Sequence, residues 1–437
     1  MARIVPMNML RGIFGAGVMP LLVLASGSAL ALDLAWSGFG TLGYTQSDQP
    51  VNYQRFIDEK GSFKRDSVLG AQLDARFSQQ WGATVQVKAA PSDHSDSQWQ
   101  ASLAWAFVSW RPSDDWLIRA GKLRLPFMLN TENADVGATY DFVRLPQEVY
   151  SIAPTTDVIG LSVSKTWFGE RFDWTAEAYS GKASTYWRFY GRDRTMDSNA
   201  SSGSWFLPID MKSTGLVLTA RSLEHTFRIG YHEGEASRPG AKIGPSFEYS
   251  PCPPPAGAPP GSTASLPYCY NVAPGGFDEV RVPIFTLAGS VSLPENFKLT
   301  AEYAKMKIAS ASRGLNRWGG YLALSKRIGA WTPYIYYAKL KSNGESLSQY
   351  QQIDSNAGVV IPAYRAYQRM VADILSPYDQ STAAFGTSFW VTPKSVIKAE
   401  WSRVNTGVVS SFVDAPVGGE SGHRQIDVFS LSYSFTF

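Results

Sequence analysis

The sequence predicts an all-β fold, a transmembrane antiparallel β-barrel of about 16 strands with short periplasmic turns and long extracellular loops. Many segments alternate between apolar and polar residues, the pattern of a strand whose two faces meet different surroundings. Beyond residue 31 no apolar run approaches the ~20 residues that a membrane-spanning helix needs. The connections between the alternating segments are short and long in turn, which is the plan of a barrel that crosses a membrane.

Composition narrows the class of protein before any segment is considered. The chain has 437 residues, of which 18% are charged and 13% aromatic. This excludes a disordered chain, which would be rich in charge and poor in aromatic residues. Basic and acidic residues number 40 and 37, so we expect no nucleic-acid partner held by net charge. Two cysteines are too few for a disulfide scaffold.

The first 31 residues have the plan of a signal peptide. A basic start precedes the apolar segment 13–24, and Ala29-Leu30-Ala31 follows as a cleavage site of the A-x-A type. The alternative is a membrane anchor helix, which Pro20 and the cleavage site disfavour. We therefore predict a signal peptide over 1–31 and an exported barrel over 32–437.

Period-two alternation defines the strands. In the segment 81–89, Trp81, Val85 and Val87 share one face, and Gln86 and Lys88 lie on the other. The predicted strands are 34–44, 67–79, 81–90, 100–111, 116–123, 157–167, 171–179, 213–221, 225–233, 280–293, 297–308, 316–328, 331–341, 380–392, 395–405 and 425–437.

The connections separate a membrane barrel from a soluble sandwich, since a sandwich has no reason to place every long loop at one end. The long loops are 45–66, 91–99, 124–156, 180–212, 234–279, 309–315, 342–379 and 406–424. Aromatic residues gather beside the short turns, as in the interfacial girdle of a barrel: Trp81, Trp116, Trp167, Phe172, Phe297 and Trp331.

The last strand carries the sharpest local signal. Phe429, Leu431, Tyr433, Phe435 and Phe437 alternate with serine and threonine, and the sequence stops on Phe437. In this it resembles bacterial outer-membrane porins, whose final strand ends in Phe and is read by the barrel-assembly machinery. The strand count is similar to that of the trimeric general and phosphate-selective porins, and the segment 119–127 is similar to a stretch of the phosphate-selective ones. The resemblance implies a homotrimer in outer-membrane lipid.

A barrel of sixteen strands is too wide for side chains to fill, so we expect a water-filled lumen. In the porins that the sequence resembles, the loop after the fifth strand folds into the barrel and makes the constriction, which here would be 124–156. The alternative is a solvated surface loop. The charged residues of this loop are Arg124, Glu132, Asp135, Asp141, Arg144 and Glu148.

Basic wall residues are expected opposite this acidic loop: Arg76, Lys88 and Arg119. Such an arrangement would make a transverse field in the passage, although the three residues differ in height and scattered solvation is the alternative. Strand parity places eight basic residues toward the lumen, namely Arg76, Lys88, Arg119, Arg221, Arg228, Lys298, Arg317 and Lys398, against the acidic Asp74, Asp173, Glu177, Glu302 and Glu400.

The resemblance and the expected lumen together imply passive diffusion of small hydrophilic solutes or ions. The count of eight basic against five acidic lumen residues predicts a weak preference for anions, which the acids of loop 124–156 could cancel. Two alternatives stay open. One is a channel selective for small anions or organic acids, and the other is a closed barrel that acts as a receptor or adhesin.

Two loops outside the predicted strands carry further signals. Cys252 and Cys269 share a proline-rich loop, and because the chain crosses the oxidising periplasm we expect a disulfide between them; two free thiols or a metal pair are the alternatives. In loop 342–379, apolar residues recur at helical spacing after Pro362, which predicts a short amphipathic helix.

Catalysis is not expected. The sequence has four histidines and contains neither a G-x-S-x-G elbow nor an H-E-x-x-H helix. His94 lies among serine and aspartate neighbours, which are the residue types of a catalytic triad, but a polar loop tip explains them more simply. We therefore expect no enzyme activity, no cofactor and no metal site.

Overall fold

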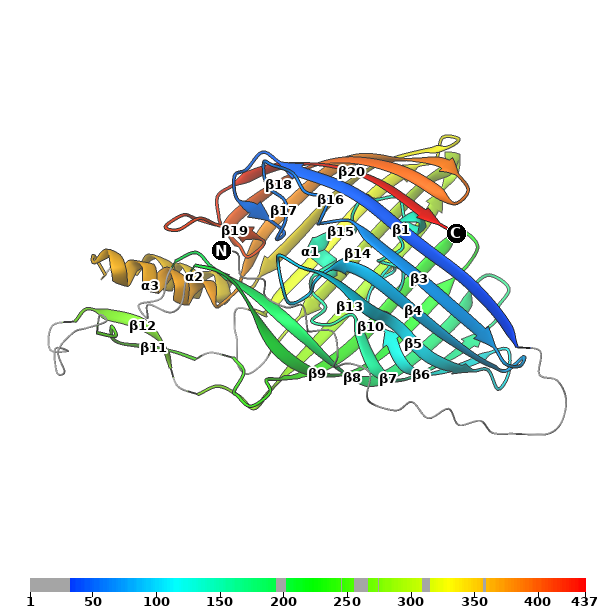
Figure 1. The fold of residues 1–437 in the computed structure, drawn as a ribbon, viewed down its shortest axis with the longest axis horizontal. Coiled ribbons are helices and arrows are strands. Elements are labelled where there is room, and N and C mark those ends of the chain that lie inside the picture. Colours follow the sequence, from blue (N-terminus) through cyan, green and yellow to red (C-terminus); the bar gives the residue numbers. More distant parts are fainter. Residues whose placement is uncertain are drawn as a thin grey trace, which may run out of the picture.

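The computed structural model describes residues 32–193, 202–244, 246–254, 266–273, 275–308, 315–356 and 359–437. The predicted signal peptide, 1–31, lies outside the described residues. Within them, sixteen antiparallel strands form one closed barrel, in which the last strand pairs with the first (Figure 1). The predicted architecture and strand number are thus confirmed.

The barrel strands run along the sequence in the order in which they pair. They are β1 (Asp33–Ser47), β3 (Val68–Arg76), β4 (Trp81–Pro91), β5 (Trp99–Trp110), β6 (Trp116–Arg124), β7 (Asp157–Trp167), β8 (Asp173–Gly191), β9 (Gly203–Arg221), β10 (His225–Ser237), β13 (Glu279–Leu293), β14 (Phe297–Met306), β15 (Arg317–Lys326), β16 (Trp331–Ser342), β17 (Tyr378–Thr392), β18 (Ser395–Ser410) and β20 (Gln425–Thr436).

The outer face of the barrel is apolar where it would meet lipid. Large apolar side chains at alternate positions of neighbouring strands are exposed, among them Leu34, Trp36, Leu69, Val85 and Leu103. Tryptophans stand beside the short turns, where Trp81 stacks on Trp110 with ring centroids 5.6 Å apart. Since every strand also pairs on both edges, the barrel satisfies the two requirements for crossing a membrane with strands.

Barrel closure depends on small residues in β1. The ring of Phe437 lies over Gly38, where a Cβ would come within 2.2 Å of it, and Phe435 lies in the same way over Gly40. Glycine at these two positions lets the aromatic end of the final strand approach the first strand closely.

The structure differs from the sequence prediction at β8 and β9. Residues 180–212 were predicted as a loop, but β8 continues to Gly191 and β9 begins at Gly203. This outer part of the hairpin, residues 182–191 and 203–212, is named the mouth hairpin here. Its charged residues, Lys182, Arg188, Asp210 and Lys212, share one face, and the other face is mainly apolar and aromatic, with Ile209 and Met211 buried. The outward-facing positions, apolar at Leu216 and Leu218, thus become polar beyond the lipid belt, and the prediction ended the strands where that change occurs.

Smaller elements lie in the long loops. They are η1 (Gly137–Thr139) and α1 (Gln147–Tyr150) in loop 124–156, α2 (Gly344–Ser355) and α3 (Pro362–Asp373), the hairpin β11 (Ser246–Pro251)–β12 (Tyr268–Ala273), the pair β2 (Asn52–Tyr53)–β19 (Val413–Asp414), and the turn η3 (Pro294–Asn296). The helix predicted after Pro362 is confirmed as α3. None of the helices in the described part of the chain is long and apolar enough to cross a membrane.

The β11–β12 hairpin, α2 and α3 extend beyond one end of the barrel (Figure 1). A disulfide joins Cys252, which follows β11, to Cys269 in β12. Gln368 of α3 accepts a hydrogen bond from the Tyr270 N–H and donates one to the Tyr270 carbonyl, so the helix adds polar side-chain contacts to the edge of β12.

Candidate functional site: the barrel lumen and its mouth

Loop 124–156 lies inside the barrel. Its first residue, Arg124, is the last residue of β6, and the remainder crosses to the wall formed by β14 to β18. Apolar side chains of the loop are buried against lumen-facing residues of that wall. They are Leu125, Phe127, Met128, Phe142, Leu145, Val149 and Ile152.

Three tyrosines of the wall hold Phe142 of the loop. Its ring makes edge-to-face contacts with Tyr321, Tyr334 and Tyr336, at centroid distances of 6.0, 5.1 and 5.6 Å. This is a favourable arrangement for aromatic quadrupoles, and it places the middle of the loop at a defined depth in the lumen.

Glu302 of β14 anchors the start and the end of the loop together. Its carboxylate accepts hydrogen bonds from the Leu129 N–H and from the hydroxyls of Tyr150 and Tyr321, each 2.7 Å long. The residue is only 3% exposed. A buried carboxylate needs several donors, and here two of the three come from the loop.

Lys398 and Glu400 of β18 anchor the middle of the loop. The Lys398 Nζ donates to the carbonyls of Gly137 and Phe142, 2.5 and 2.8 Å away. Glu400 accepts hydrogen bonds from Tyr334 and Tyr336, and the Tyr334 hydroxyl accepts one from the Val143 N–H.

Two further wall contacts complete the attachment. The Arg228 guanidinium of β10 donates to the Met128 carbonyl, 2.6 Å away. Glu148 of α1 is buried against β17, where its carboxylate accepts hydrogen bonds from Gln380 and Thr382. The loop is therefore tied to the wall from β10 round to β18.

The basic wall and the acidic loop meet in direct ion pairs. Lys88 binds Asp135 at 2.8 Å, and Arg124 binds the same carboxylate. Arg119 binds Glu177 of β8 at 2.7 Å and lies 3.7 Å from Glu132. These charges were expected to face each other across open water. Their contact neutralises much of the transverse field because opposite charges at this distance cancel at longer range.

The other predicted site residues are spread over different surroundings. Arg144 makes a two-pronged ion pair with Asp66, 2.7 Å from its Nε. Asp141 accepts a hydrogen bond from Ser388, 3.3 Å away. Arg76 lines a separate cavity at the short-turn end of the wall, together with Arg119.

The sequence correctly predicts that Glu302, Lys398 and Glu400 face the lumen, but it does not predict that they hold the loop. The tyrosines at 321, 334 and 336 were missed altogether. A signal for them was present, since strand parity puts Tyr334 and Tyr336 on the lumen face of β16, where a large aromatic residue needs something to pack against.

The loop divides the free space of the lumen. One cavity of about 490 Å³, the outer chamber, lies on the long-loop side and is bordered by Arg55, Arg65 and Phe412. A second cavity of about 260 Å³, the periplasmic chamber, lies toward the short turns and is bordered by Arg221, Lys298 and Trp390. Tyr140 contributes to both, so it stands between them.

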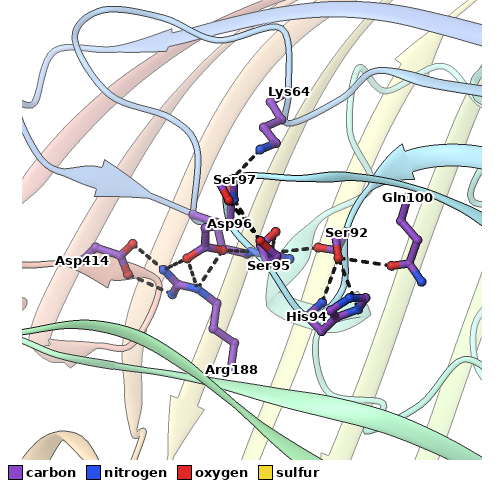
Figure 2. A network of polar contacts seen from close by, with 10 residues as sticks. Lys64, Ser92, His94, Ser95, Asp96, Ser97, Gln100, Arg188 and Asp414 are labelled. Carbon is purple, nitrogen blue, oxygen red and sulfur yellow. Dashed lines mark hydrogen bonds and ion pairs between the residues drawn. The ribbon is translucent and has the colours of Figure 1, made fainter. Parts of the chain in front are cut away.

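The mouth hairpin crosses the long-loop end of the barrel. Arg188 of β8 makes a two-pronged ion pair with Asp414, at 2.6 and 2.9 Å, and a second ion pair with Asp96 (Figure 2). Asp414 lies between β18 and β20, which stand opposite β8 and β9 in the strand order. The hairpin thus spans the mouth from one side to the other.

A second group of ion pairs ties the hairpin turn to the loop helices. Arg192 binds Asp373 of α3 at 3.0 Å and also binds Asp354 of α2. Asp193 binds Arg369 of α3 at 2.5 Å. Burial raises the pKa of Asp373 to about 6, although the Arg192 guanidinium opposes the shift. Burial likewise raises the pKa of Asp414.

The cluster of serine, histidine and aspartate around His94 does not have triad geometry. Ser92 and Asp93 both approach the same ring nitrogen, Nδ1, at 3.3 and 2.8 Å. A catalytic histidine must use one nitrogen toward the nucleophile and the other toward the acid. Figure 2 shows His94 beside Ser92 in a polar loop that also carries Asp96.

Comparison with known proteins shows likeness in fold. An anion-selective porin from Comamonas acidovorans is 10% identical and aligns over 93% of this chain and 100% of its own, with a TM-score of 0.50. The outer membrane channel DcaP of Acinetobacter baumannii is 12% identical and aligns over 93% and 99%, with a TM-score of 0.48. No protein-family model and no curated protein sequence matches the chain.

The chain therefore has the fold of the 16-stranded outer-membrane porins. A closed barrel with an apolar outer belt belongs in an outer membrane.

Proposed function

We propose that the protein is an outer-membrane porin, a water-filled channel for passive diffusion of small hydrophilic solutes or ions that weakly favours anions. The observation that carries this proposal is a sixteen-stranded barrel whose inserted loop leaves a chamber on each side, each with charged residues in its wall. A barrel of this width encloses water, and the loop sets the size of what passes.

Anion preference is supported by the burial of three acidic residues that face the lumen. Glu148, Glu302 and Glu400 are each at most 4% exposed, and hydroxyl, amide or backbone N–H donors occupy their oxygens. Lys298 and Arg221 border the periplasmic chamber, where Asp141 is the acid beside them. Lys398 and Arg228 are buried in the same way, so the basic residues left to meet permeating ions are those that border the chambers, among them Arg65, Arg221 and Lys298.

The proposal includes three expectations that rest on sequence and resemblance. The signal peptide 1–31 is removed after Ala31, the barrel-assembly machinery reads the final strand, and the mature protein forms a homotrimer. Catalysis is not part of the proposed function.

A liposome-swelling assay with purified, folded protein tests the proposal. Vesicles that contain the protein should swell in an isotonic solution of a small sugar, and more slowly as the sugar grows, because loop 124–156 limits the passage. Vesicles with heat-denatured protein are the control. Absence of swelling with every sugar, from protein that keeps its folded mobility on a gel, would refute a diffusion channel.

A further inference from the structure

We infer that the outer chamber binds a small organic anion, a carboxylate on an apolar body, through the guanidinium of Arg65. The inference rests on the proposed function, because the ligand would reach this chamber as a solute of the channel. It gives the chamber a chemical preference that passive diffusion alone does not require.

The outer chamber has the size and enclosure of a ligand site. Its volume of about 490 Å³ lies within the range of ~300–1,000 Å³ that is usual for ligand pockets. The first long loop contributes Arg55, Arg65 and Asp66 to its wall, and loop 124–156 contributes the floor. The mouth hairpin crosses above, and Arg55 is tied to that crossing through Asp96, 2.7 Å away.

Charge in the chamber is unbalanced in favour of cations. Four arginines border it, Arg55, Arg65, Arg124 and Arg144, against the two acids Asp66 and Asp135. Asp66 forms an ion pair with Arg144, and Asp135 forms ion pairs with both Arg124 and Lys88. Arg55 forms an ion pair with Asp96, and the same carboxylate also binds Arg188.

Arg65 is the arginine for which no carboxylate remains within ion-pair distance among the described residues. Its Nε and one terminal nitrogen donate to the side-chain oxygen of Gln54, at 3.3 and 3.2 Å. A guanidinium has five N–H donors, so donors are left for a ligand. Burial, and next the neighbouring Arg144, lowers the pKa of Arg65 to about 10, and the Asp66 carboxylate only partly opposes the shift; Asp66 makes its ion pair with Arg144, so Arg65 has no counter-charge in contact.

Nearby acids of the lumen do not supply that counter-charge. Glu148 lies against Gln380 and Thr382, and Glu400 lies against Tyr334 and Tyr336. Neither borders the outer chamber. An incoming carboxylate would therefore meet a cation that is pre-positioned and only partly hydrogen-bonded, which favours a two-pronged contact.

The rest of the chamber wall is largely apolar and aromatic. Phe56, Phe127, Met128, Val143 and Phe412 border it. A strongly hydrated inorganic anion gains nothing from such a wall, whereas an organic acid can bury its body there. The chemistry of the chamber thus points to a carboxylate with an apolar ring or chain.

Isothermal titration calorimetry of the detergent-solubilised protein with benzoate tests this inference. Benzoate should bind with one saturable site, and benzyl alcohol, which has the ring without the charge, should not. The Arg65→Gln variant should bind benzoate between about 10-fold and about 100-fold more weakly, which corresponds to losing a charged hydrogen-bond pair. Arg221→Gln, which removes an arginine of the periplasmic chamber, should bind as the natural protein does.

Equal benzoate affinity in Arg65→Gln and Arg221→Gln would overturn the inference, as would equal binding of inorganic phosphate and benzoate. Arg65→Lys provides a second variant that retains the charge; it should bind more weakly than the natural protein and more tightly than Arg65→Gln. Titration does not need conduction, so binding without a pore would refute only the proposed function, and a pore without binding would refute only this inference.

Discussion

Glu302 shows how one buried side chain can hold a loop across the lumen of a barrel. It holds the beginning and the end of loop 124–156 to β14 through three hydrogen bonds. The Glu302→Ala variant should leave three buried donors without an acceptor, at a cost on the order of 1–3 kcal/mol for each group that stays unsatisfied. We therefore expect a lower unfolding temperature and a larger, less uniform single-channel conductance, because the loop is released.

Asp74→Ala is the matched control for that variant. Asp74 also faces the lumen, but its carboxylate binds Gln72 and Thr84 of the wall and not the loop. Equal conductance in Glu302→Ala and the natural protein would show that Glu302 does not position the loop.

The sequence predicts that the Glu302 side chain faces the lumen, but it does not predict that this side chain anchors the loop. Strand parity correctly places it toward the lumen. Its partners, Leu129 and Tyr150, lie more than 150 residues away along the chain, and only the folded loop brings them together. The ion pairs of Lys88 and Arg119 with loop acids depend on the same long-range placement.

Among the strands and loops, the mouth hairpin should respond to pH through Asp373. Its pKa of about 6 in the docked arrangement is above the ordinary value of 3.8, so the docked carboxyl binds a proton more tightly than an exposed one. The docked arrangement therefore gains stability as the pH falls through about 6 and loses it as the pH rises. The raised pKa of Asp414 acts in the same direction.

We expect the channel to open less often at about pH 5 than at about pH 7.5, because the hairpin is held more firmly over the mouth at the lower pH. Open probability in a planar bilayer, recorded across this range, is the measurement. Asp373→Asn should remove most of the pH dependence. A natural protein that opens more readily at the lower pH would contradict the expected direction of the effect.

The disulfide between Cys252 and Cys269 stabilises a loop and not the barrel. It closes a segment of 17 residues beside the β11–β12 hairpin, a length for which a disulfide contributes about 3 kcal/mol in the chain-entropy account. Reduction should make the region 238–279 more sensitive to protease and leave the folded mobility of the barrel on a gel unchanged. Loss of that mobility on reduction would show that the barrel depends on the bond.

The surroundings of each element explain whether the sequence could predict it. The sixteen strands alternate because one face meets lipid and the other the lumen, and all sixteen were located from that pattern. In the outer parts of β8 and β9 the alternation continues, but polar residues such as Asp210 and Lys212 replace apolar ones on the outward face, while Ile209 and Met211 are buried on the other; a prediction that requires an apolar outer face therefore ends too early. Helix α2 begins at the capping residue Asn343 but has only a weak apolar stripe, and it was not predicted.

The barrel as a whole combines a wide wall with a filled interior. Sixteen strands alone would leave a broad aqueous bore, and the sequence was sufficient to predict that wall. Loop 124–156 then occupies the middle of the lumen, and the mouth hairpin crosses the outer end. A barrel divided into two chambers by this loop should therefore conduct much less than an unobstructed barrel of this size.

Single-channel recording of the purified, folded protein in a planar bilayer, under a potassium chloride gradient, tests the central claim most directly. We predict small stepwise openings and a reversal potential whose sign indicates preference for chloride, because Glu148, Glu302 and Glu400 are buried and hydrogen-bonded while Arg65, Arg221 and Lys298 border the chambers. A silent bilayer from folded protein would contradict the channel, and a reversal potential of the opposite sign would contradict the account of its charges.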